Sequence, residues 1–316
     1  MEIDLFESGN GGYITMNTCC VLYNPKAANG NGLAEAKKLE QIWSDRSFTY
    51  TDVTQIADVR GFLESAPADE TVVLAGGDGT VNHFVNSLDG QAPAREVYFF
   101  AAGTGNDFLN DLGLSRNDPP FLLNPYIKDL PTVTVAGMTR YFINGIGYGI
   151  DGYCCEVGDK KRLKSTKLVN YTAIAIKGLL YGFHRTRAEV TVDGETRSYR
   201  AVWLSPTMKG RYFGGGMMCA PSQDRLAADA CVTSMTMTGR SKLKTLTVFP
   251  SIFKGKHINH TEMVTIRSGH EVTVRFDRPT ALQIDGETVL GVTEYTVRAP
   301  HPVQHPDKTA AATASR

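Results

Sequence analysis

The sequence predicts two domains, an open α/β domain with a parallel sheet followed by an antiparallel β-sandwich domain. The chain has 316 residues, enough for two domains of ordinary size. Its first half alternates apolar, strand-like runs with helical patterns, which indicates a parallel sheet covered by helices. From about residue 133 the pattern changes to short alternating runs separated by Gly, Asp and Asn, which is typical of a sandwich. We therefore expect the boundary near residues 135–140.

Apolar spacing defines the elements of the first domain. Short apolar runs bounded by glycine are too short for free helices and indicate buried strands, whereas spacings of three and four residues indicate helices. In chain order we expect a strand at 19–23, a helix at about 33–43, a strand at 48–53, a helix at about 56–65, and strands at 71–75 and 97–101 separated by a helix at 81–88.

The second domain is expected to contain nine strands and a helical insertion at about 166–183. The strands are predicted at 133–136, 140–144, 187–193, 198–205, 231–237, 262–266, 271–276, 280–284 and 294–298. We assign residues 16–138 to the α/β domain and 139–300 to the sandwich, and leave open whether the last strand returns to the first domain. Residues 1–15 are expected to form a flexible extension, and residues 301–316 a disordered tail.

Composition excludes several classes of protein. The 33 basic residues balance 33 acidic ones, so we expect no nucleic-acid partner. No run approaches the roughly 18 to 20 apolar residues of a membrane-spanning helix, and the acidic, Gly- and Asn-rich start does not have the pattern of a signal peptide. The six cysteines have no CxxC spacing. Together these features predict a cytoplasmic protein whose thiols are reduced and mostly buried.

The sequence Gly76-Gly77-Asp78-Gly79-Thr80 lies between a predicted buried strand and a helix. Glycines allow the backbone to approach an anion, and a helix N-terminus supplies free amides, so the loop suits a phosphate group. Asp78 cannot bind an anion directly, and its place among such amides suggests that it holds Mg²⁺ or orients a bound group. A tight turn with an Asp cap is the alternative for this loop taken alone.

Two further loops of similar design follow predicted strands. Residues 101–108 (AAGTGNDF) again place glycines before a helix and include Asn106 and Asp107. Residues 24–32 (NPKAANGNG) follow the first strand, with Pro25 stiffening the turn and Asn and Gly permitting left-handed backbone. Loops at the C-terminal ends of neighbouring parallel strands face one crevice, which is the expected ligand position in an open α/β sheet.

The chain contains no GxxxxGK[ST] loop and none of the VAIK, HRD and DFG motifs of protein kinases. Asn24-Pro25, GGDGTVN at 76–82 and GTGNDF at 103–108 resemble the catalytic-domain motifs of the diacylglycerol and sphingosine lipid kinases, especially the bacterial diacylglycerol-kinase-like members. The resemblance extends over residues 24–298 through FINGIGYGID at 142–151, GGGMMCAP at 214–221, KGKH at 254–257 and DGE at 285–287.

This resemblance implies an ATP- and Mg²⁺-dependent enzyme with an NAD kinase/diacylglycerol kinase-like first domain, a lipid pocket in the second domain and chemistry in the cleft. Asp78 and Asp107 would sit at Mg-ATP, and Glu287 would be the general base that takes the proton from the acceptor hydroxyl. A diacylglycerol-like lipid would become a phosphatidic-acid-like product. The resemblance implies nucleotide contacts from Asn24, Pro25, Lys26, Ala27, Ala28, Thr51, Gly76, Gly77, Asp78, Gly79, Thr80, Val81, Asn82, His83, Gly103, Thr104 and Asn106.

The tripeptide Asp-Gly-Glu occurs twice, at 193–195 and at 285–287. Between two alternating runs, Asp-Gly is a common hairpin turn, and this interpretation is preferred for the first copy. At the second copy a turn is equally possible from the residues, and only the family resemblance favours a catalytic role for Glu287.

The chain departs from the family pattern at three positions. Family members follow the Ala-Pro dipeptide with a stretch that ends in Asp-Asp-Gly, whose Asp helps to hold a structural Mg²⁺, and Ala227 replaces that Asp. Asp224 or Asp229 is the candidate substitute ligand. Thr134 or a neighbour replaces a common acidic residue, and His83 replaces the usual Glu after GGDGTVN.

Two groups of basic residues lie close to apolar ones, which suits a protein that docks peripherally on an anionic membrane. Solvated helix faces beside an ordinary core are the alternative. The basic residues are Lys160, Lys161, Arg162, Lys164 and Lys167 in one group and Lys242, Lys244, Lys254, Lys256 and His257 in the other, around Phe249, Ile252 and Phe253. A structural role is preferred over metal binding for His257 and His260.

Three alternatives stay open beside a lipid kinase. An NAD kinase-like or a phosphofructokinase-like enzyme would use a similar glycine loop, and a lipid- or nucleotide-binding regulator would explain Ala227 and Thr134. GTGNDF and the long sandwich ending in DGE favour the lipid kinase, and the presence of Asp78, Asp107 and Glu287 favours turnover. A sheet edge in the second domain would allow a homodimer.

Overall fold

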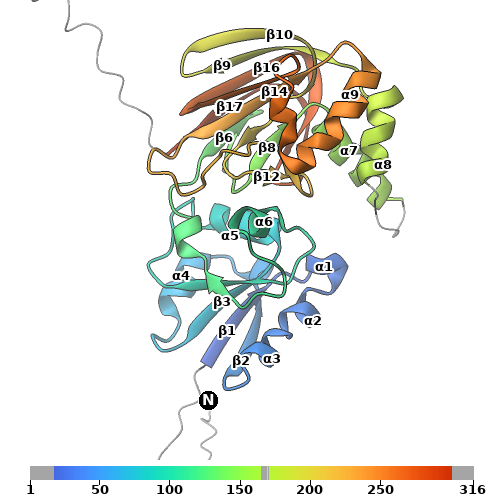
Figure 1. The fold of residues 1–316 in the computed structure, drawn as a ribbon. Helices are drawn as coiled ribbons and strands as arrows, with labels where there is room; N and C mark the ends of the chain where they lie inside the picture. The colour runs from blue at the N-terminus through green and yellow to red at the C-terminus, as the bar shows by residue number, and fades with distance from the viewer. Residues whose placement is uncertain (1–17, 165–168, 170, 301–316) are drawn as a thin grey trace, which may run out of the picture. The chain divides into compact units, whose positions relative to one another are not determined.

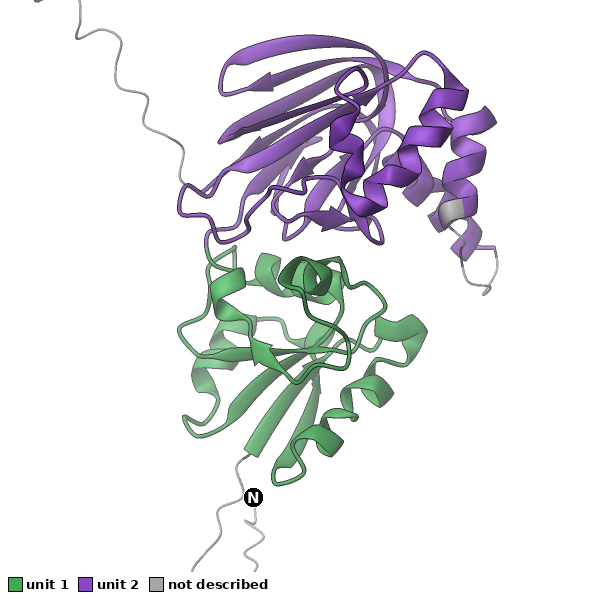
Figure 2. Ribbon diagram, viewed as in Figure 1, with its two compact units in different colours: residues 1–128 green, residues 129–316 purple. Residues whose placement is uncertain are grey.

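The structure, a computed structural model, describes residues 18–164, 169 and 171–300. The expected extension at 1–15 and tail at 301–316 lie outside the described residues. The chain forms two compact units, residues 1–128 and 129–316 (Figure 2). The division falls before the expected boundary at 135–140, because the strand at 132–135 pairs with the last strand of the second unit.

The first unit is built on a five-stranded sheet whose order is β2-β1-β3-β4-β5 (Figure 1). β1 is parallel to β2 and β3, and β3 is parallel to β4, whereas β5 is antiparallel to β4. The strands are β1 (Thr18–Tyr23), β2 (Ser47–Asp52), β3 (Thr71–Gly76), β4 (Val97–Ala101) and β5 (Phe121–Leu122). The apolar runs of β1 and β3 are almost fully buried, as expected for parallel strands covered on both faces.

Helices cover this sheet, with α2 packing on β1 and β3 and α5 packing on β3. The elements are α1 (Ala27–Gly30), α2 (Gly32–Ala36), α3 (Leu39–Ile42), η1 (Val53–Gln55), α4 (Val59–Ser65), α5 (Asp78–Ser87), α6 (Asp107–Leu112) and η2 (Asn124–Tyr126). The single helix expected at 33–43 is interrupted, because the amides of Lys38, Glu40 and Gln41 bond three residues back rather than four. α4 begins at Val59 rather than near 56, since the Asp58 side chain accepts from the Gly61 amide.

The second unit contains a ten-stranded sheet (Figure 1). One long strand of this sheet, β16, has different neighbours along its first and second halves. Its strands are β6 (Thr132–Val135), β7 (Met138–Tyr141), β8 (Gly145–Tyr148), β9 (Thr186–Val192), β10 (Glu195–Leu204), β11 (Thr207–Met208), β14 (Val232–Thr238), β15 (Val264–Gly269), β16 (Glu271–Ile284) and β17 (Glu287–Arg298). The first half of β16 pairs with β9 and its second half with β8. β12 (Tyr212–Phe213) and β13 (Met217–Met218) form a separate pair.

β16 corrects the expectation of separate strands at 271–276 and 280–284. It is continuous, and its register against β17 shifts between Arg275 and Thr280, where Pro279 cannot donate a ladder hydrogen bond. β17 pairs with β16 and β6, so the last described strand belongs to the second unit.

Helices α7 (Ile150–Arg162), α8 (Tyr171–Lys177) and α9 (Lys242–Val248) lie along one side of this sheet (Figure 1). Short turns complete the layer: η3 (Gly178–Gly182), η4 (Phe249–Lys254) and η5 (Lys256–Asn259). The helical insertion expected at 166–183 therefore begins earlier, at Ile150, and residues 165–168 and 170 lie outside the described part. Among the described residues, no helix has both the length and the apolar character needed to cross a bilayer.

Among the described residues of the second unit, two hydrophobic cores are present. One lies between the halves of the sheet around Tyr148 and Tyr295, and the other lies under the helices around Trp203 and Met235. All six cysteines are free thiols, and four of them are buried in the two units. Burial raises the pKa of Cys154 to about 12, so this thiol stays protonated and inert, as the sequence predicts.

His257 is fully buried in the second unit, which corrects its expected place on a membrane-docking surface. Its Nε2 lies 3.1 Å from the carbonyl oxygen of Cys219, and its Nδ1 has no hydrogen-bond partner among the described residues. Burial, opposed by the Cys219 carbonyl and reinforced by His260, lowers the pKa of His257 below its ordinary value of 6.5. Phe249 and Ile252 are buried as well, and of the three apolar residues in that group Phe253 alone is exposed.

We predict that His257 makes the protein less stable in mild acid. As the pH falls below about 6.5, the unfolded chain binds a proton at this residue while the folded chain does not, so the free energy of unfolding falls. The loss is up to about 1.4 kcal/mol per pH unit until the folded pKa is reached. The measurement is the urea midpoint between pH 7.5 and 5.5. His257→Gln, which can still donate to Cys219, should flatten this pH dependence, whereas the control His260→Gln should retain it. Equal slopes for all three proteins would contradict the prediction.

Candidate active site

The loops that follow β3 and β4 touch backbone to backbone. A Cβ added to Gly103 would lie 2.4 Å from both Cα and N of Gly77, which is closer than any side chain can approach. The amide of Ala102 also donates to the carbonyl oxygen of Gly76 at 2.9 Å. Glycine is therefore required at position 103 for the two loops to meet.

This contact brings two carboxylate residues together. Asp78 is the first residue of α5, Asp107 is the first residue of α6, and the Asp107 amide donates to Asp78 Oδ2 at 2.9 Å. Gly77 is the N-cap of α5 and has no side chain with which to cap it. The positive end of a helix dipole favours negative charge, so both carboxylates occupy favourable positions at these helix starts.

The loop after β1 is joined to the same cluster. Asn24 Nδ2 donates to Thr80 Oγ1 at 3.3 Å, and Asn24 Oδ1 accepts from the Lys26 amide at 2.9 Å. Ala28 and Asn29 both have left-handed backbone, with φ of 48° and 57°. As the sequence predicts, the loops after β1, β3 and β4 therefore lie together at the C-terminal edge of the parallel sheet.

The predicted nucleotide-binding residues differ in how they can reach a ligand. Gly79, His83 and Thr104 are exposed, whereas Thr80, Val81 and Asn82 are buried in α5. The Val81 side chain belongs to the core, and its backbone amide donates to the Gly77 carbonyl oxygen at 3.1 Å. Thr51 lies on β2 opposite Leu22 and hydrogen-bonds the Cys20 thiol, one strand away from the loop at 24–32.

The second unit carries the DGE sequence at the tip of the β16–β17 hairpin. Asp285 and Gly286 form a two-residue turn with φ of 45° and 94°, and Glu287 is the first residue of β17. The Glu287 side chain is 51% exposed and its Oε2 lies 2.5 Å from Arg140 Nη1 on β7. This ion pair gives the exposed carboxylate a defined orientation.

The Asp285 carboxylate anchors this turn to the loop that precedes β8. It accepts hydrogen bonds from the amides of Ile143 at 2.6 Å, Asn144 at 2.9 Å and Gly145 at 3.0 Å. Three donors on one carboxylate make a rigid junction, because each bond to a charged acceptor is stronger than a neutral one. The position of Glu287 is therefore fixed by its neighbour in sequence as well as by Arg140.

The other DGE sequence forms the same turn with different contacts. Asp193 and Gly194 have φ of 47° and 82°, and Val192 pairs with Glu195, so the expected hairpin at 193–195 is confirmed. Asp193 accepts from the amides of His270 and Glu271, while Glu195 pairs with Arg197 and Arg267. The tripeptide thus specifies a turn in both places, and the neighbouring residues distinguish the two copies.

Asp224 and Asp229 do not form a metal site. Both are exposed, Asp224 Oδ1 accepts from the Leu226 amide, and Asp229 Oδ1 accepts from the Cys231 amide. Among the described residues, no group of three or more His, Cys, Asp or Glu side chains is placed to hold a metal ion. The residues present therefore do not fit the structural Mg²⁺ that the family resemblance implies.

A buried arginine lies between these two aspartates in sequence and provides a positive charge that belongs to the chain. Arg225 is 5% exposed, and its guanidinium donates to the Ile143 carbonyl oxygen at 2.6 Å and to Asn144 Oδ1 at 2.9 Å. Lys209 is 2% exposed, and burial together with the nearby Arg225 lowers its pKa. Carbonyl and amide oxygens are also the ligands that a hard cation prefers, so Arg225 meets a requirement that a metal ion would otherwise meet.

The cluster at Asp78 and Asp107 fits a magnesium ion that arrives with a nucleotide. Mg²⁺ is usually bound through one or two carboxylates and the phosphates of the substrate rather than by a cage of protein ligands. Two carboxylate residues joined by a hydrogen bond, next to glycine loops that phosphate can approach, meet that requirement.

Several polar residues of the second unit were missed by sequence reasoning. Arg225 and Lys209 read as surface residues, because nothing in their neighbourhood in sequence announces burial. Asp151 is 7% exposed, and a Cβ added to Gly147 would lie 2.0 Å from its Oδ2, so it packs directly against the glycine-rich strand β8. The alternating glycines of FINGIGYGID were the available signal for this close approach.

Comparisons with known proteins agree with this architecture. Residues 18–135 match the family model described as diacylglycerol kinase catalytic domain, and residues 144–303 match the YegS C-terminal NAD kinase beta sandwich-like domain. A diacylglycerol kinase of Mycobacterium tuberculosis is 27% identical over 221 residues, or 67% of this chain and 69% of the relative. A diacylglycerol kinase of Bacillus subtilis is 25% identical over 287 residues, or 86% and 90%.

A solved structure gives the same result for the fold. The crystal structure of a diacylglycerol kinase from Bacillus anthracis matches with a TM-score of 0.56 at 16% identity, covering 91% of this chain and 96% of that one. The predicted fold class, a parallel α/β unit followed by an antiparallel β-rich unit, is confirmed.

We predict that Gly103→Ala destabilises the first unit. The added methyl group must displace the Gly77 backbone, and overpacking of this kind costs about 1–3 kcal/mol. Gly79→Ala is the matched control, because a Cβ at Gly79 meets nothing within 4 Å and alanine favours helix by up to about 1 kcal/mol. Thermal unfolding should show a lower midpoint for Gly103→Ala and an unchanged or higher one for Gly79→Ala. Equal midpoints would show that the loops do not need this contact.

We also predict that the second unit keeps its stability without a divalent ion. The urea midpoint of the wild-type protein should be the same in excess EDTA and in excess MgCl₂. Arg225→Ala should lower it in both solutions, since it leaves the Ile143 and Asn144 oxygens buried and unpaired at about 1–3 kcal/mol each. The control Arg197→Ala removes an exposed ion pair and should leave the midpoint nearly unchanged in both solutions. A magnesium-dependent midpoint in the wild type would refute this account.

Proposed function

This chain belongs to the diacylglycerol kinase and YegS-like family of lipid kinases, and on that premise we propose that it transfers the γ-phosphoryl group of ATP to the hydroxyl of a diacylglycerol-like lipid. The match to the C-terminal family model covers half of the chain, and the match to the catalytic-domain model covers most of the rest. The resemblance to this family is thereby confirmed, as is the expectation of a kinase. The product would be a phosphatidic-acid-like phospholipid.

The observation that carries the proposal is the junction of the loops that follow β3 and β4. Phosphoryl transfer depends mainly on positioning and on neutralising phosphate charge, with little covalent chemistry for the protein to perform. Backbone amides at the start of α5 and the glycines around Gly103 would hold the phosphates. The hydrogen bond between the Asp107 amide and Asp78 keeps the two loops in register for that task.

We assign Asp78 and Asp107 to the magnesium ion of Mg-ATP. When bound, the ion would neutralise the negative charge that builds up on the transferred phosphate. Asn24 would hold the third loop against Thr80, and Lys26, exposed on that loop, would add a positive charge near the phosphates. Thr51, Thr104, Asn106 and the residues from Gly76 to His83 complete the proposed nucleotide site.

We assign Glu287 as the general base for the acceptor hydroxyl. An exposed carboxylate with a fixed orientation suits this role, because the base must reach the proton in a defined geometry. Asp285 is a positioning residue in this scheme, since it holds the turn on the amides of residues 143–145. Arg225 donates hydrogen bonds to the Ile143 carbonyl oxygen and to Asn144 Oδ1 in the same loop, and would help to position Glu287 through that loop.

The proposed acceptor also defines where the enzyme works. A diacylglycerol-like lipid resides in a bilayer and ATP resides in the cytoplasm, so the protein would act at the cytoplasmic surface of a membrane. An acidic residue of the family pattern is replaced by Thr134 or a neighbour, and Thr134 shares a hydrogen bond with Thr139 across β6 and β7. This neutral pair would affect substrate choice more than the fold.

We predict that the purified protein, given labelled ATP and Mg²⁺, labels a lipid in a panel of diacylglycerols, sphingoid bases, NAD and fructose 6-phosphate. Asp78→Asn keeps an oxygen for the Asp107 amide but loses its charge, and turnover should fall on the order of 100-fold or more. Glu287→Gln should lower kcat by about 10²–10⁴-fold with little change in nucleotide affinity. Glu195→Gln is the matched control and should keep full activity.

The other outcomes separate the alternatives. Label in NAD or in the sugar phosphate alone would indicate a small-molecule kinase. Nucleotide binding without any labelled product would indicate a regulator. Full activity of Glu287→Gln, or an equal loss in Glu195→Gln, would show that Glu287 is not the base.

A further inference from the structure

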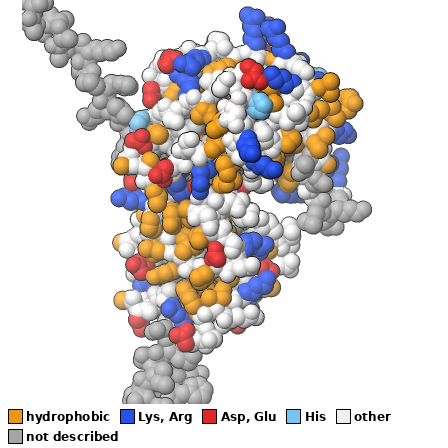
Figure 3. Space-filling model, in the orientation of Figure 1, with side chains coloured by type: hydrophobic (Ala, Val, Ile, Leu, Met, Phe, Trp, Pro, Cys, Tyr) orange, Lys and Arg blue, Asp and Glu red, His pale blue; other side chains and the backbone are white. Residues whose placement is uncertain are grey.

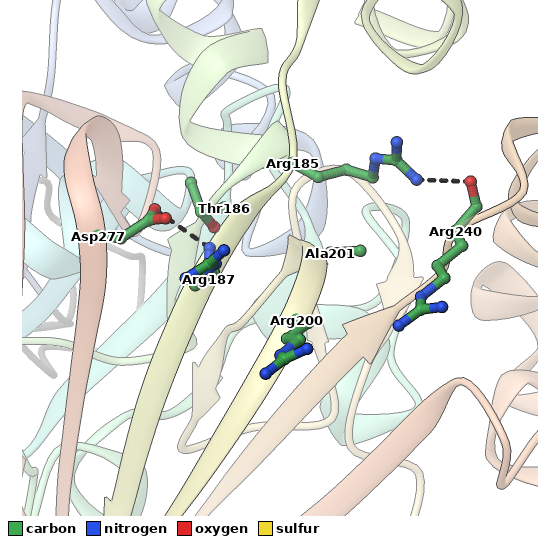
Figure 4. A pocket seen from close by; sticks show the side chains of 7 residues that line it. All are labelled: Arg185, Thr186, Arg187, Arg200, Ala201, Arg240 and Asp277. Carbon is green, nitrogen blue, oxygen red and sulfur yellow. Dashed lines mark hydrogen bonds between the residues drawn. The ribbon is translucent and has the colours of Figure 1, made fainter.

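A hollow of about 440 Å³ on the second unit is surrounded by arginines (Figure 4). It belongs to β9, β10, the segment after β14 and the middle of β16, whereas the DGE turn lies at the far end of β16. Asp277 and Asp285 are eight residues apart, which is up to about 26 Å along an extended strand. The lining residues are Arg185, Thr186, Arg187, Arg200, Ala201, Arg240 and Asp277.

An irregularity in the sheet creates this hollow. Tyr199 pairs with Ala188 and Val202 pairs with Thr186, so two residues of β10, Arg200 and Ala201, face the single residue Arg187 of β9. Ala201 has φ of 56°, a left-handed conformation that is unfavourable for alanine. Bulges of this kind re-aim side chains and occur at functional positions. Here the bulge gathers Arg187 and Arg200 at one place.

The charges around the hollow are unbalanced. Among the described lining residues, four guanidinium groups face one carboxylate, that of Asp277, which accepts from the Arg187 amide at 3.1 Å. Arg185 is held in place because its Nη1 donates to the carbonyl oxygens of Gly239 and Arg240 and its guanidinium lies over the Trp203 ring. Arginines repel one another, so an anion in the hollow would relieve that repulsion.

A buried hydroxyl independently indicates a ligand. Thr186 is 2% exposed, lines the hollow, and its Oγ1 has no hydrogen-bond partner among the described residues. An unpaired buried polar group is unfavourable, and native proteins rarely leave one unsatisfied. An oxygen-rich anion would accept from this hydroxyl and from the planar forks of the arginines, a combination that fits phosphate.

We propose that this hollow binds the phosphate of an anionic phospholipid headgroup at the membrane surface. Tyr181 and Leu243 are 77% and 78% exposed, and they precede Arg185 and follow Arg240 by only a few residues. Lys242 Nζ donates to the Leu180 carbonyl oxygen, which joins α9 to η3 beside these apolar side chains. Figure 3 shows hydrophobic and basic side chains together where α8 and α9 lie.

Exposed apolar side chains next to a phosphate site are what a membrane-docking surface requires, because the apolar groups enter the interface while the arginines hold headgroups. A soluble phosphate compound would need the arginines alone and would give no role to Tyr181 and Leu243. The site goes beyond the proposed transfer reaction, since none of its residues belongs to the proposed catalytic groups.

The first experiment measures sedimentation of the full chain with phosphatidylcholine vesicles that contain or omit phosphatidic acid. Phosphatidic acid should increase binding, and Arg200→Gln/Arg240→Gln should weaken binding to these vesicles roughly 10- to 30-fold. The control Arg197→Gln/Arg298→Gln removes the same amount of charge from exposed ion pairs that do not line the hollow. It should change binding less than about 3-fold. No loss in the pocket variant, or an equal loss in the control, would overturn the proposal.

The second experiment uses Thr186→Val, which removes the hydroxyl but keeps the shape of the side chain. Its thermal midpoint should be unchanged or higher, while its affinity for the phosphatidic acid vesicles should fall about 3- to 10-fold. Titration with inorganic phosphate by calorimetry distinguishes the source of the anion. If pocket variants lose phosphate binding yet bind vesicles normally, the site serves a soluble phosphate and the lipid proposal is wrong. Unchanged vesicle affinity of Thr186→Val would likewise count against it.

Discussion

The first unit depends on one close contact between two segments of its backbone, at Gly103 and Gly77. Parallel strands bring their C-terminal ends to the same edge of a sheet, but loops that carry side chains would hold each other apart there. Because a Cβ at Gly103 would overlap the Gly77 backbone, the two loops can approach this closely only with glycine at position 103. The hydrogen bond from the Asp107 amide to Asp78 follows from this contact, and so does the placing of both helix starts around one point.

In the second unit, two charged side chains, Asp285 and Arg225, fix one loop in a comparable way. The loop at residues 143–145 offers its amides to the Asp285 carboxylate, while Arg225 takes the Ile143 carbonyl oxygen and the Asn144 side-chain oxygen. Peptide groups held between an anion and a cation are stabilised by both charges. The turn that carries Glu287 is thereby fastened to the body of the sheet.

The sequence was informative where a local pattern determines the structure. The apolar runs of β1, β3 and β4 predict buried strands because they are too short to form free helices. The glycine loops that follow these strands predict that Asp78 and Asp107 lie close together. Local patterns were insufficient where distant residues decide. Hydrogen bonds to residues three positions back interrupt the helix at 33–43, and continuous pairing with β17 merges the runs at 271–276 and 280–284. Arg225 and His257 have sequence neighbours typical of a surface, and only tertiary packing buries them.

Because Arg225 supplies the positive charge at residues 143–145, the second unit does not need a metal ion from solution there. A bound ion must be captured from solution after synthesis, and it leaves when its concentration falls. A guanidinium is delivered with the polypeptide and is always charged, so the junction at residues 143–145 forms as soon as the chain folds. On the proposed mechanism, a shortage of magnesium would slow turnover without unfolding the second unit, and activity would return with the ion.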